Sequence, residues 1–287
     1  MKFCHISPTA HLSDFCEQQT HHLLLAHLIE SDPEYTQWYA SRKSSKNVYI
    51  MDNSAFEMYK QGREMYPMEN LIEMGTRVGA DYIVMSDYPN EPGKKTIEAA
   101  ELLGPKLKER GFGTFFVPQS VIGDIEDYIA TFAWAASSRV VDYIGVSILG
   151  VPNAYGVEKD NKLQRFMSRW RMMNELEDRG ILNLARRNNK KIHFLGMVDG
   201  PNEIPLCYPR FHIDTWDSSA GVWAGLRGIA FDTSPTGLIN GKYEEEVDFS
   251  YESKDVNDIV RAQRNCEYIN NLADYDESCP EKCEGTW

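Results

Sequence analysis

FHIDTWDSSAG, at residues 211 to 221, begins with an apolar run and ends in small polar residues. The pattern predicts a buried strand over Phe211–Ile213 that stops at two carboxylates, Asp214 and Asp217. Because a buried carboxylate is costly unless it is paired or used, at least one of the two is a candidate functional residue. An aspartate that closes a strand is also a common turn or helix cap, and this simpler interpretation stays open.

Seven further apolar runs of strand length precede this stretch along the chain. They are Lys2–Ile6, His22–His27, Asn47–Met51, Asp81–Met85, Thr114–Val117, Tyr143–Ile148 and Lys191–Leu195. Several of these runs are continuous in Val, Ile, Phe and Tyr, which favours parallel strands that are covered on both faces.

Segments with apolar residues at helical spacing separate most of the runs. They are Met68–Val78, Thr96–Arg110, Ile125–Ala136 and Leu163–Asn188. The connections after the first and seventh strands are short, and prolines at 201, 205 and 209 discourage a long helix in the latter. Eight strands that alternate with helices predict an α/β protein with the (β/α)8 TIM-barrel fold.

We expect one domain over residues 1–287, in which the barrel ends near residue 227 and a short extension occupies residues 228–287. Turn signals at Thr236-Gly237 and Asn240-Gly241 predict a hairpin within this extension. Val256–Leu272 is predicted to be a closing helix, and the acidic tail after it is expected to be loosely held.

The composition is ordinary for a globular protein, with 42% hydrophobic and 25% charged residues. The sequence contains neither a run of 18 apolar residues nor a signal peptide at its start. We therefore expect a cytoplasmic protein that has no membrane partner.

The six cysteines do not resemble the framework of a secreted disulfide protein. The isolated ones are Cys4, Cys16, Cys207 and Cys266. Cys279 and Cys283 are four residues apart, a step that can supply two metal ligands. We expect no cofactor, and a structural zinc ion on Cys266, Cys279 and Cys283 is the alternative.

The net charge of -13 argues against nonspecific coating of nucleic acid, because neutralising phosphates requires Lys and Arg. Positive charge is nevertheless concentrated between Lys159 and Lys191. This cluster predicts a nucleic-acid contact, and a solvated helix face is the alternative. The arginines expected to bind the backbone are Arg165, Arg169, Arg186 and Arg187.

Polar and small residues follow the predicted strands at the end where barrel active sites lie. They are Ser7, Asp52-Asn53-Ser54, Asp87, Gln119, Gly150, Gly196-Met197 and Asp217. Carboxylates that face each other across a pocket can bind a metal, manage protons or attack a sugar carbon. These residues include neither a His cluster nor a D-x-D step, which disfavours the metal, so cleavage of a glycosidic bond is the better hypothesis.

Several of these segments resemble the motifs of tRNA-guanine transglycosylases, in the same order along the chain. Asp52–Glu57 (DNSAFE) resembles the D-S-G-G-F-Q signature, and Ile213–Asp217 (IDTWD) is similar to the V-D-x-F-D nucleophile strand. The other similar segments are Met85-Ser86-Asp87, Val117-Pro118-Gln119, Ile148-Leu149-Gly150 and His193–Met197. The resemblance spans about residues 47 to 221.

The resemblance implies a role for each matching residue. Asp217 would be the covalent nucleophile and Asp52 the proton-handling carboxylate. Asp214 would not attack, since strand alternation sends Asp214 and Asp217 to opposite faces. Asp87 and Gln119 would read the edge of the base. The remaining substrate-binding positions would be Asn53, Phe56, Gly150, Gly196 and Met197, and Tyr88 and Trp216 are further aromatic candidates.

The departures from the family favour DNA over tRNA as the substrate. The family's C-x-C-x-x-C zinc site and its tRNA-docking insertion have no counterpart here, and N-S-A replaces S-G-G. A compact relative of this kind looks most like the phage-type DNA 7-deazaguanine transglycosylases, which would work in the host cytoplasm. The implied partners are DNA and a free 7-deazaguanine (preQ0-like) base. A tRNA transglycosylase and a noncatalytic barrel subunit are the alternatives, and the oligomeric state stays open.

Overall fold

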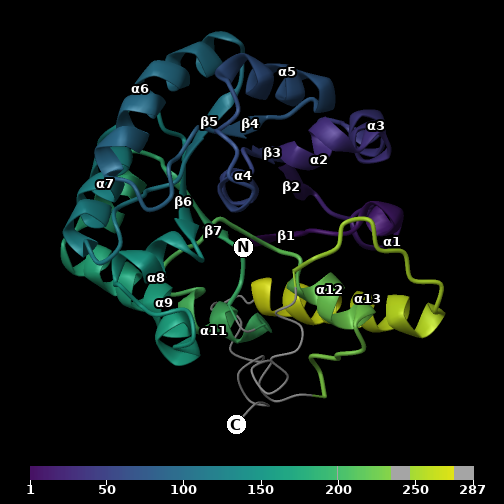
Figure 1. The fold of residues 1–287 in the computed structure, drawn as a ribbon. Helices are drawn as coiled ribbons and strands as arrows, with labels where there is room; N and C mark the ends of the chain where they lie inside the picture. The colour runs from purple at the N-terminus through teal and green to yellow at the C-terminus, as the bar shows by residue number, and fades with distance from the viewer. Residues whose placement is uncertain (199, 234–245, 275–287) are drawn as a thin grey trace.

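The computed structural model describes residues 1–198, 200–233 and 246–274. Eight parallel strands form one sheet that curls into a nearly closed barrel, with the helices outside (Figure 1). The strands are β1 (Lys2–His5), β2 (His21–Leu25), β3 (Val48–Asp52), β4 (Tyr82–Val84), β5 (Gly113–Phe116), β6 (Tyr143–Ser147), β7 (Lys191–Leu195) and β8 (Thr215–Ser218). The predicted (β/α)8 barrel is therefore confirmed.

Each strand pairs with the next one along the chain, except at one seam. β1 pairs with β8, so that Lys2 is opposite Thr215, and β1 and β2 lie side by side without a backbone ladder between these two described strands. Instead, the side chain of Gln19 accepts a hydrogen bond from the His5 N–H (2.9 Å) and donates one to the His5 carbonyl (3.3 Å). A side-chain amide thus satisfies the backbone N–H and carbonyl of His5 at the seam.

The longest helices form the outer layer, and polar residues cap several of their N-termini. The helices are α1 (Leu12–Phe15), α2 (Ala26–Ser31), α3 (Pro33–Arg42), α4 (Ala55–Lys60), α5 (Met68–Val78), α6 (Gly93–Glu109), α7 (Ile125–Ser137), α8 (Gly150–Ala154), α9 (Lys162–Asp178), α10 (Ile181–Arg187), α11 (Glu203–Cys207), α12 (Ala220–Leu226) and α13 (Val256–Ala273), with short 3-10 turns at Thr9–His11 and Gly200–Asn202. Asp32, Asp124, Asn161 and Asp255 accept backbone N–H groups at the starts of α3, α7, α9 and α13. None of the described helices is long and apolar enough to cross a membrane.

The predicted position of the eighth strand is wrong. Phe211 and Ile213 are buried, but Phe211 lies in a turn and Ile213 in an irregular segment, and the strand itself is Thr215–Ser218. His212 has a left-handed backbone with φ 51°, and its N–H bonds to the Pro209 carbonyl (3.0 Å). An apolar run therefore marked buried residues correctly but not their backbone conformation.

The predicted helix over Leu163–Asn188 is two helices, α9 and α10. Gly180 separates them with φ 73°, a conformation that glycine adopts without strain. The connection from β6 to β7 thus runs down the barrel in α9 and turns before α10.

The closing helix of the extension is confirmed as α13, one residue longer than predicted. It packs against α12, where Gly225 lies so close to Ala262 that an added Cβ would meet the Ala262 Cα at 2.2 Å. The two predicted hairpin turns, and the tail that contains Cys279 and Cys283, lie outside the described residues.

Three aspartates stand just before β4, β6 and β8, at the amino end of the barrel. Each accepts a backbone N–H from a neighbouring strand: Asp81 from Tyr49 (2.7 Å), Asp142 from Thr114 (2.9 Å) and Asp214 from Ile192 (2.8 Å). Asp214 therefore does not point into the mouth of the barrel, because it precedes the strand that Asp217 occupies.

Candidate active site

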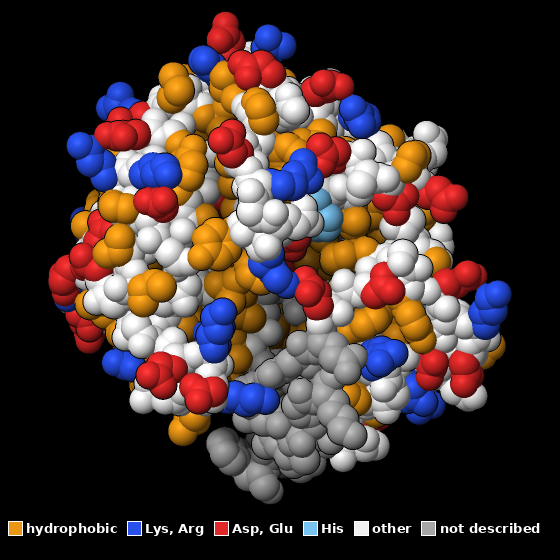
Figure 2. All heavy atoms as spheres, in the orientation of Figure 1, with side chains coloured by type: hydrophobic (Ala, Val, Ile, Leu, Met, Phe, Trp, Pro, Cys, Tyr) orange, Lys and Arg blue, Asp and Glu red, His pale blue; other side chains and the backbone are white. Residues whose placement is uncertain are grey.

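The predicted site residues gather at the carboxyl end of the barrel. Asp52 is the last residue of β3, Asp87 and Gln119 follow β4 and β5, and Asp217 lies within β8. α4 lies inside the ring of outer helices, and the centre of the molecule beside it is hollowed, with both acidic and basic side chains at its border (Figures 1 and 2). The strand ends thus bring together residues that are far apart in the sequence.

Asp87 is the centre of a buried hydrogen-bond network. Asn53 Nδ2 donates to Asp87 Oδ1 (2.8 Å) and to the Met85 carbonyl (2.7 Å), and Gln119 Nε2 donates to Asp87 Oδ2. Burial raises the pKa of Asp87 to about 6, although the two amides favour its charged form. Asp87, Asn53 and Gln119 therefore form one polar unit.

The turn after β3 fixes the orientation of the residues that follow Asp52. Ser54 adopts a left-handed backbone with φ 55°. Its N–H donates to Asp52 Oδ2 (2.9 Å), and the Ala55 N–H donates to Asn53 Oδ1 (2.9 Å) at the start of α4. His27 contacts the Ser54 hydroxyl through its backbone N–H and its ring. The turn therefore holds Asp52 Oδ2 and Asn53 Oδ1 through two backbone N–H groups.

Asp52 lies in an environment that disfavours its charge. Burial raises its pKa well above the usual range, and the carboxylates of Glu57, Asp87 and Asp217 raise it further. The protonated form is therefore favoured, which suits a group that donates a proton. Glu57 is a mouth carboxylate that the sequence interpretation did not select, although the last position of the DNSAFE segment could have identified it.

Asp217 has hydrogen-bond donors on one of its two oxygens. His193 Nε2 contacts Asp217 Oδ1 at 2.8 Å, and the Gly196 N–H donates to the same oxygen at 3.3 Å. His193 Nδ1 lies 2.6 Å from the hydroxyl of Thr215, which is on the same face of β8 as Asp217. The sequence interpretation did not assign His193 a role, but the alternation of β7 places it on the inner face.

The predicted glycines lie where a side chain would crowd the site. A Cβ at Gly150 would meet Gln119 Oε1 at 3.3 Å, and one at Gly196 would meet Ile148 at 2.9 Å. Gly196 also has φ 71°, and Met197 beside it is buried. Phe56 on α4 is 43% exposed, with the Lys60 ammonium 5.1 Å from its ring centre. These positions border the mouth.

The predicted nucleic-acid surface does not form a single patch. Arg169 is fully buried and pairs with Glu203, so its assignment to an exposed basic face is wrong. Arg165 is in the first turn of α9, which follows the carboxyl end of β6, whereas Arg186 and Arg187 end α10 just before β7 begins. The structure therefore separates these arginines along the height of the barrel, because α9 alone is about 25 Å long.

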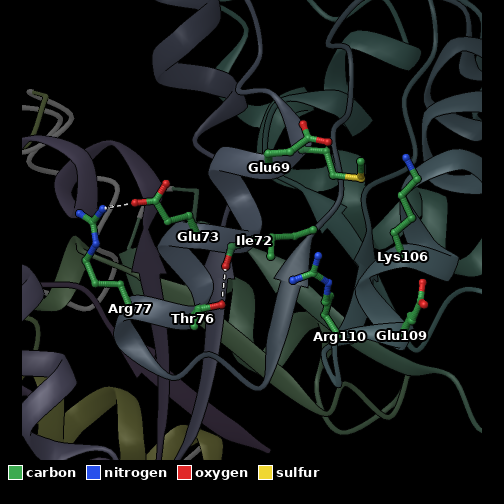
Figure 3. Close-up of a pocket in the computed structure, with 9 residues that line it drawn as sticks. Glu69, Ile72, Glu73, Thr76, Arg77, Lys106, Glu109 and Arg110 are labelled. Atoms are coloured by element: carbon green, nitrogen blue, oxygen red, sulfur yellow. Dashed lines mark hydrogen bonds and ion pairs between the residues drawn. The ribbon is translucent and has the colours of Figure 1, made fainter.

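The described residues support neither a metal site nor a second site made of the predicted residues. They contain no group of three or more potential metal ligands, and Cys279 and Cys283 lie outside them, so the zinc alternative stays a prediction. A groove on the outer surface lies between α5 and α6 (Figure 3). It is lined by Ile72, Arg77, Lys106 and Arg110 among others, and none of the predicted site residues lines it.

Comparison with models of known protein families gives no match, and no curated protein matches the sequence. The resemblance to transglycosylases therefore depends on the motifs alone.

Proposed function

We propose that this protein is a base-exchange transglycosylase that replaces guanine in DNA by a 7-deazaguanine base. The observation that carries the proposal is that two aspartates of opposite character share one barrel mouth. Asp217 Oδ1 lies within hydrogen-bond distance of His193 Nε2 and the Gly196 N–H, whereas burial and neighbouring carboxylates favour the protonated form of Asp52. Carboxyl groups whose environments differ in this way are suited to the roles of nucleophile and acid.

In the first half-reaction, Asp217 attacks the anomeric carbon of the target nucleotide. His193 and Gly196 hold Oδ1, which leaves Oδ2 for the attack. A bond forms between Oδ2 and C1′ while the bond from C1′ to the guanine nitrogen breaks, and the departing base takes the proton of Asp52. The products are free guanine and a covalent deoxyribosyl aspartate.

In the second half-reaction, the ring nitrogen of the 7-deazaguanine attacks C1′ and displaces Asp217. Its N–H proton returns to Asp52, which restores both carboxyl groups to their starting states. No oxidant, reductant or metal is needed to balance the exchange.

Asp87 and Gln119 recognise the base in both half-reactions. An ionised Asp87 accepts from the N–H groups of a guanine-like edge, and the amide of Gln119 both donates and accepts. In the free protein these two side chains bond to each other, so the base replaces contacts that already exist. Such a preorganised pair selects for a planar heterocycle with adjacent donors.

The target nucleotide must leave the duplex to reach this mouth, which costs a few kcal/mol. Phe56 is an exposed aromatic residue on α4 that can receive an unstacked base. The predicted arginines do not form a single patch. Arg165, which lies on the mouth side of α9, is the one among them best placed to contact a phosphate. DNA remains the preferred nucleic acid, and tRNA is the alternative.

The test is incorporation of a radiolabelled 7-deazaguanine into duplex DNA and into unmodified tRNA, measured in parallel. We expect the label in DNA, release of one guanine for each base incorporated, and no incorporation by the Asp217→Asn variant. Label in tRNA alone would move the assignment to the tRNA enzymes. No label in either nucleic acid would refute the exchange and favour a noncatalytic barrel.

A further inference from the structure

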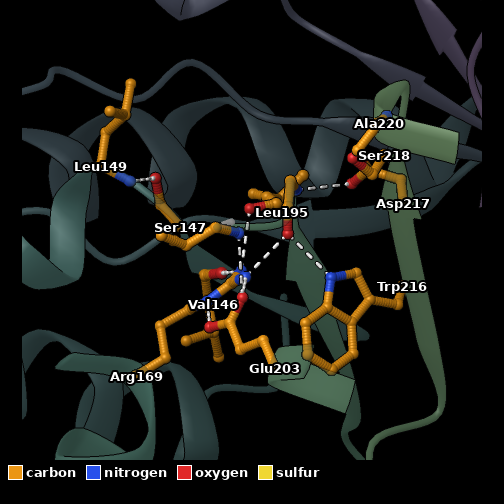
Figure 4. A network of polar contacts seen from close by, with 12 residues as sticks. Val146, Ser147, Leu149, Arg169, Leu195, Glu203, Trp216, Asp217, Ser218 and Ala220 are labelled. Atoms are coloured by element: carbon orange, nitrogen blue, oxygen red, sulfur yellow. Dashed lines mark hydrogen bonds and ion pairs between the residues drawn. The ribbon is translucent and has the colours of Figure 1, made fainter. Parts of the chain in front are cut away.

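A buried ion pair lies directly behind the mouth, between the barrel and its outer helices (Figure 4). Arg169 of α9 and Glu203 of α11 are both fully buried. Arg169 Nε donates to Glu203 Oε1 at 2.7 Å, and Nη2 donates to Oε2 at 2.5 Å. The pair is bidentate, which fixes the plane of the guanidinium group.

The rest of the guanidinium contacts the carboxyl ends of two strands. Nη1 donates to the carbonyls of Val146 on β6 (3.1 Å) and Leu195 on β7 (2.9 Å), and Nη2 also donates to the Gly196 carbonyl (2.8 Å). Together with the two bonds to Glu203, these contacts use all five N–H groups of an arginine. A lysine could not replace this arrangement, because its three donors diverge from one atom.

The contact with Leu195 continues to Asp217 through a single peptide group. The carbonyl of the Leu195–Gly196 peptide accepts from Arg169, and the N–H of that same peptide donates to Asp217 Oδ1 (3.3 Å). Hydrogen bonds in series polarise one another, so a cation on the carbonyl strengthens the N–H as a donor. The charge of Arg169 thus acts on Asp217 without direct contact.

The following peptide is fixed in the same way. The Gly196 carbonyl accepts from Arg169 and from the indole N–H of Trp216 (2.7 Å). Gly196 has φ 71°, so the chain reverses here, and the two donors set the direction in which it continues to Met197. One guanidinium therefore orients both peptides at the point where β7 enters the mouth.

We propose that Arg169 and Glu203 are positioning residues, which aim the Gly196 N–H at Asp217 and hold the Gly196–Met197 backbone against the substrate. The kinetic part of this inference rests on the proposed function, whereas the hydrogen bond from Gly196 to Asp217 does not. The competing explanation is a purely structural ion pair. Replacing both members of a buried ion pair by apolar residues often preserves stability, so the two explanations can be separated.

The first measurement is the amide signal of Gly196 by NMR. Glycine labelled at nitrogen and leucine labelled at its carbonyl carbon select Leu–Gly peptides, which occur at Gly104, Gly150 and Gly196. We expect the Gly196 proton to move upfield in Asp217→Asn, and by a similar amount in the double variant Arg169→Met, Glu203→Leu. The signals of Gly104 and Gly150 should stay in place.

The second measurement is the kinetics of base exchange by the same double variant. We expect kcat to fall about a hundredfold with KM nearly unchanged, because a misaimed nucleophile affects the reaction step more than binding. A matched control replaces the surface pair that joins α7 to α9, Glu126→Leu with Arg179→Met, whose bonds are 2.6 and 2.7 Å long. The control should leave both kcat and the Gly196 signal unchanged.

The outcomes distinguish this inference from the proposed function. If the wild-type protein exchanges no base but the Gly196 signal moves as expected, the positioning contact stands and the function is wrong. A double variant with wild-type kcat and an unmoved signal would overturn the inference. If the double variant does not fold, a Gly196 signal that stays in place in Asp217→Asn overturns it, and a signal that moves in Arg169→Lys as well as in Asp217→Asn supports it.

Discussion

The two ends of the barrel place the same residue type in two kinds of environment. At the carboxyl end, Asp52, Asp87 and Asp217 face one another across the mouth. At the amino end, Asp81, Asp142 and Asp214 stand before β4, β6 and β8, and each accepts a backbone N–H of the adjacent strand. Position relative to the strand thus separates candidate catalytic aspartates from aspartates that hold the sheet together.

The pKa of Asp142 at the amino end shifts in the opposite direction from those of the mouth aspartates, whereas the pKa of Asp214 shifts in the same direction. Burial disfavours ionisation of Asp142, but hydrogen bonds from Lys108 and Thr114 outweigh it, and its pKa is lowered. Burial raises the pKa of Asp214 despite its backbone donor. At the mouth, burial raises the pKa of both Asp52 and Asp87, and the nearest charges around Asp52 are other carboxylates. Raised carboxyl pKa values that come from burial and from neighbouring carboxylates are common at functional sites.

The largest expected effect comes from replacing an aspartate by asparagine, either at Asp217 within β8 or at Asp214 just before it. Asp217→Asn should lower base exchange by at least about a thousandfold and trap no denaturation-resistant adduct, because the amide is not a nucleophile. Asp214→Asn should keep the adduct and lose stability instead, since it weakens the bond to Ile192. Adduct gels and thermal melts of the two variants check this contrast, and an adduct that vanishes only in Asp52→Asn would exchange the roles of Asp52 and Asp217.

A smaller effect concerns the pH dependence of base binding. Only ionised Asp87 accepts from the base, and its pKa is about 6 in the free protein. As the pH falls through this value the carboxylate gains a proton, so affinity for 7-deazaguanine should drop about tenfold for each further pH unit. Calorimetric titrations across this range measure the effect. Asp87→Asn should bind weakly at every pH, and a flat profile in the wild type would contradict the assignment.

The smallest effect is on stability at the amino end. Asp142→Ala leaves the Thr114 N–H without its acceptor and should lower the free energy of unfolding by about 1–3 kcal/mol, with kcat unchanged. Because the pKa of Asp142 is lowered, this difference should be present above the ordinary value of 3.8 and be lost as the pH falls below it. Urea unfolding at several pH values measures it. Asp160→Ala, at an exposed residue, is the control and should stay within about 0.5 kcal/mol.

Sequence patterns were sufficient for the barrel and for most of the mouth. Asp52, Asp87, Gln119 and Asp217 could be placed because alternating strands and helices fix which ends of the strands meet, whatever the exact boundaries. The eighth strand was misplaced because burial and strand conformation leave the same apolar signature. Phe211 is fully buried within a turn that no local pattern distinguishes from a strand.

Arg169 shows why the remaining contacts could not be predicted. It stands in a run rich in Lys and Arg, which is typical of a solvated helix face, and nothing nearby indicates burial. Its partner Glu203 is 34 residues further along, on a short helix after β7. Pairing at that separation depends on how α9 and α11 pack, which a single sequence does not encode locally.

The seam between β1 and β2 leaves the first strand without its backbone partner for most of synthesis. β1 has no ladder with its sequence neighbour β2 among the described strands, so its backbone partner is β8, and Lys2 is opposite Thr215. A ribosome that adds about 5–20 residues per second needs roughly 10–40 seconds to make the chain between them. Throughout that interval the edge of β1 that pairs with β8 is open. Ribosome-associated chaperones that shield such edges should therefore increase the yield of this barrel more than that of one whose first two strands form a ladder.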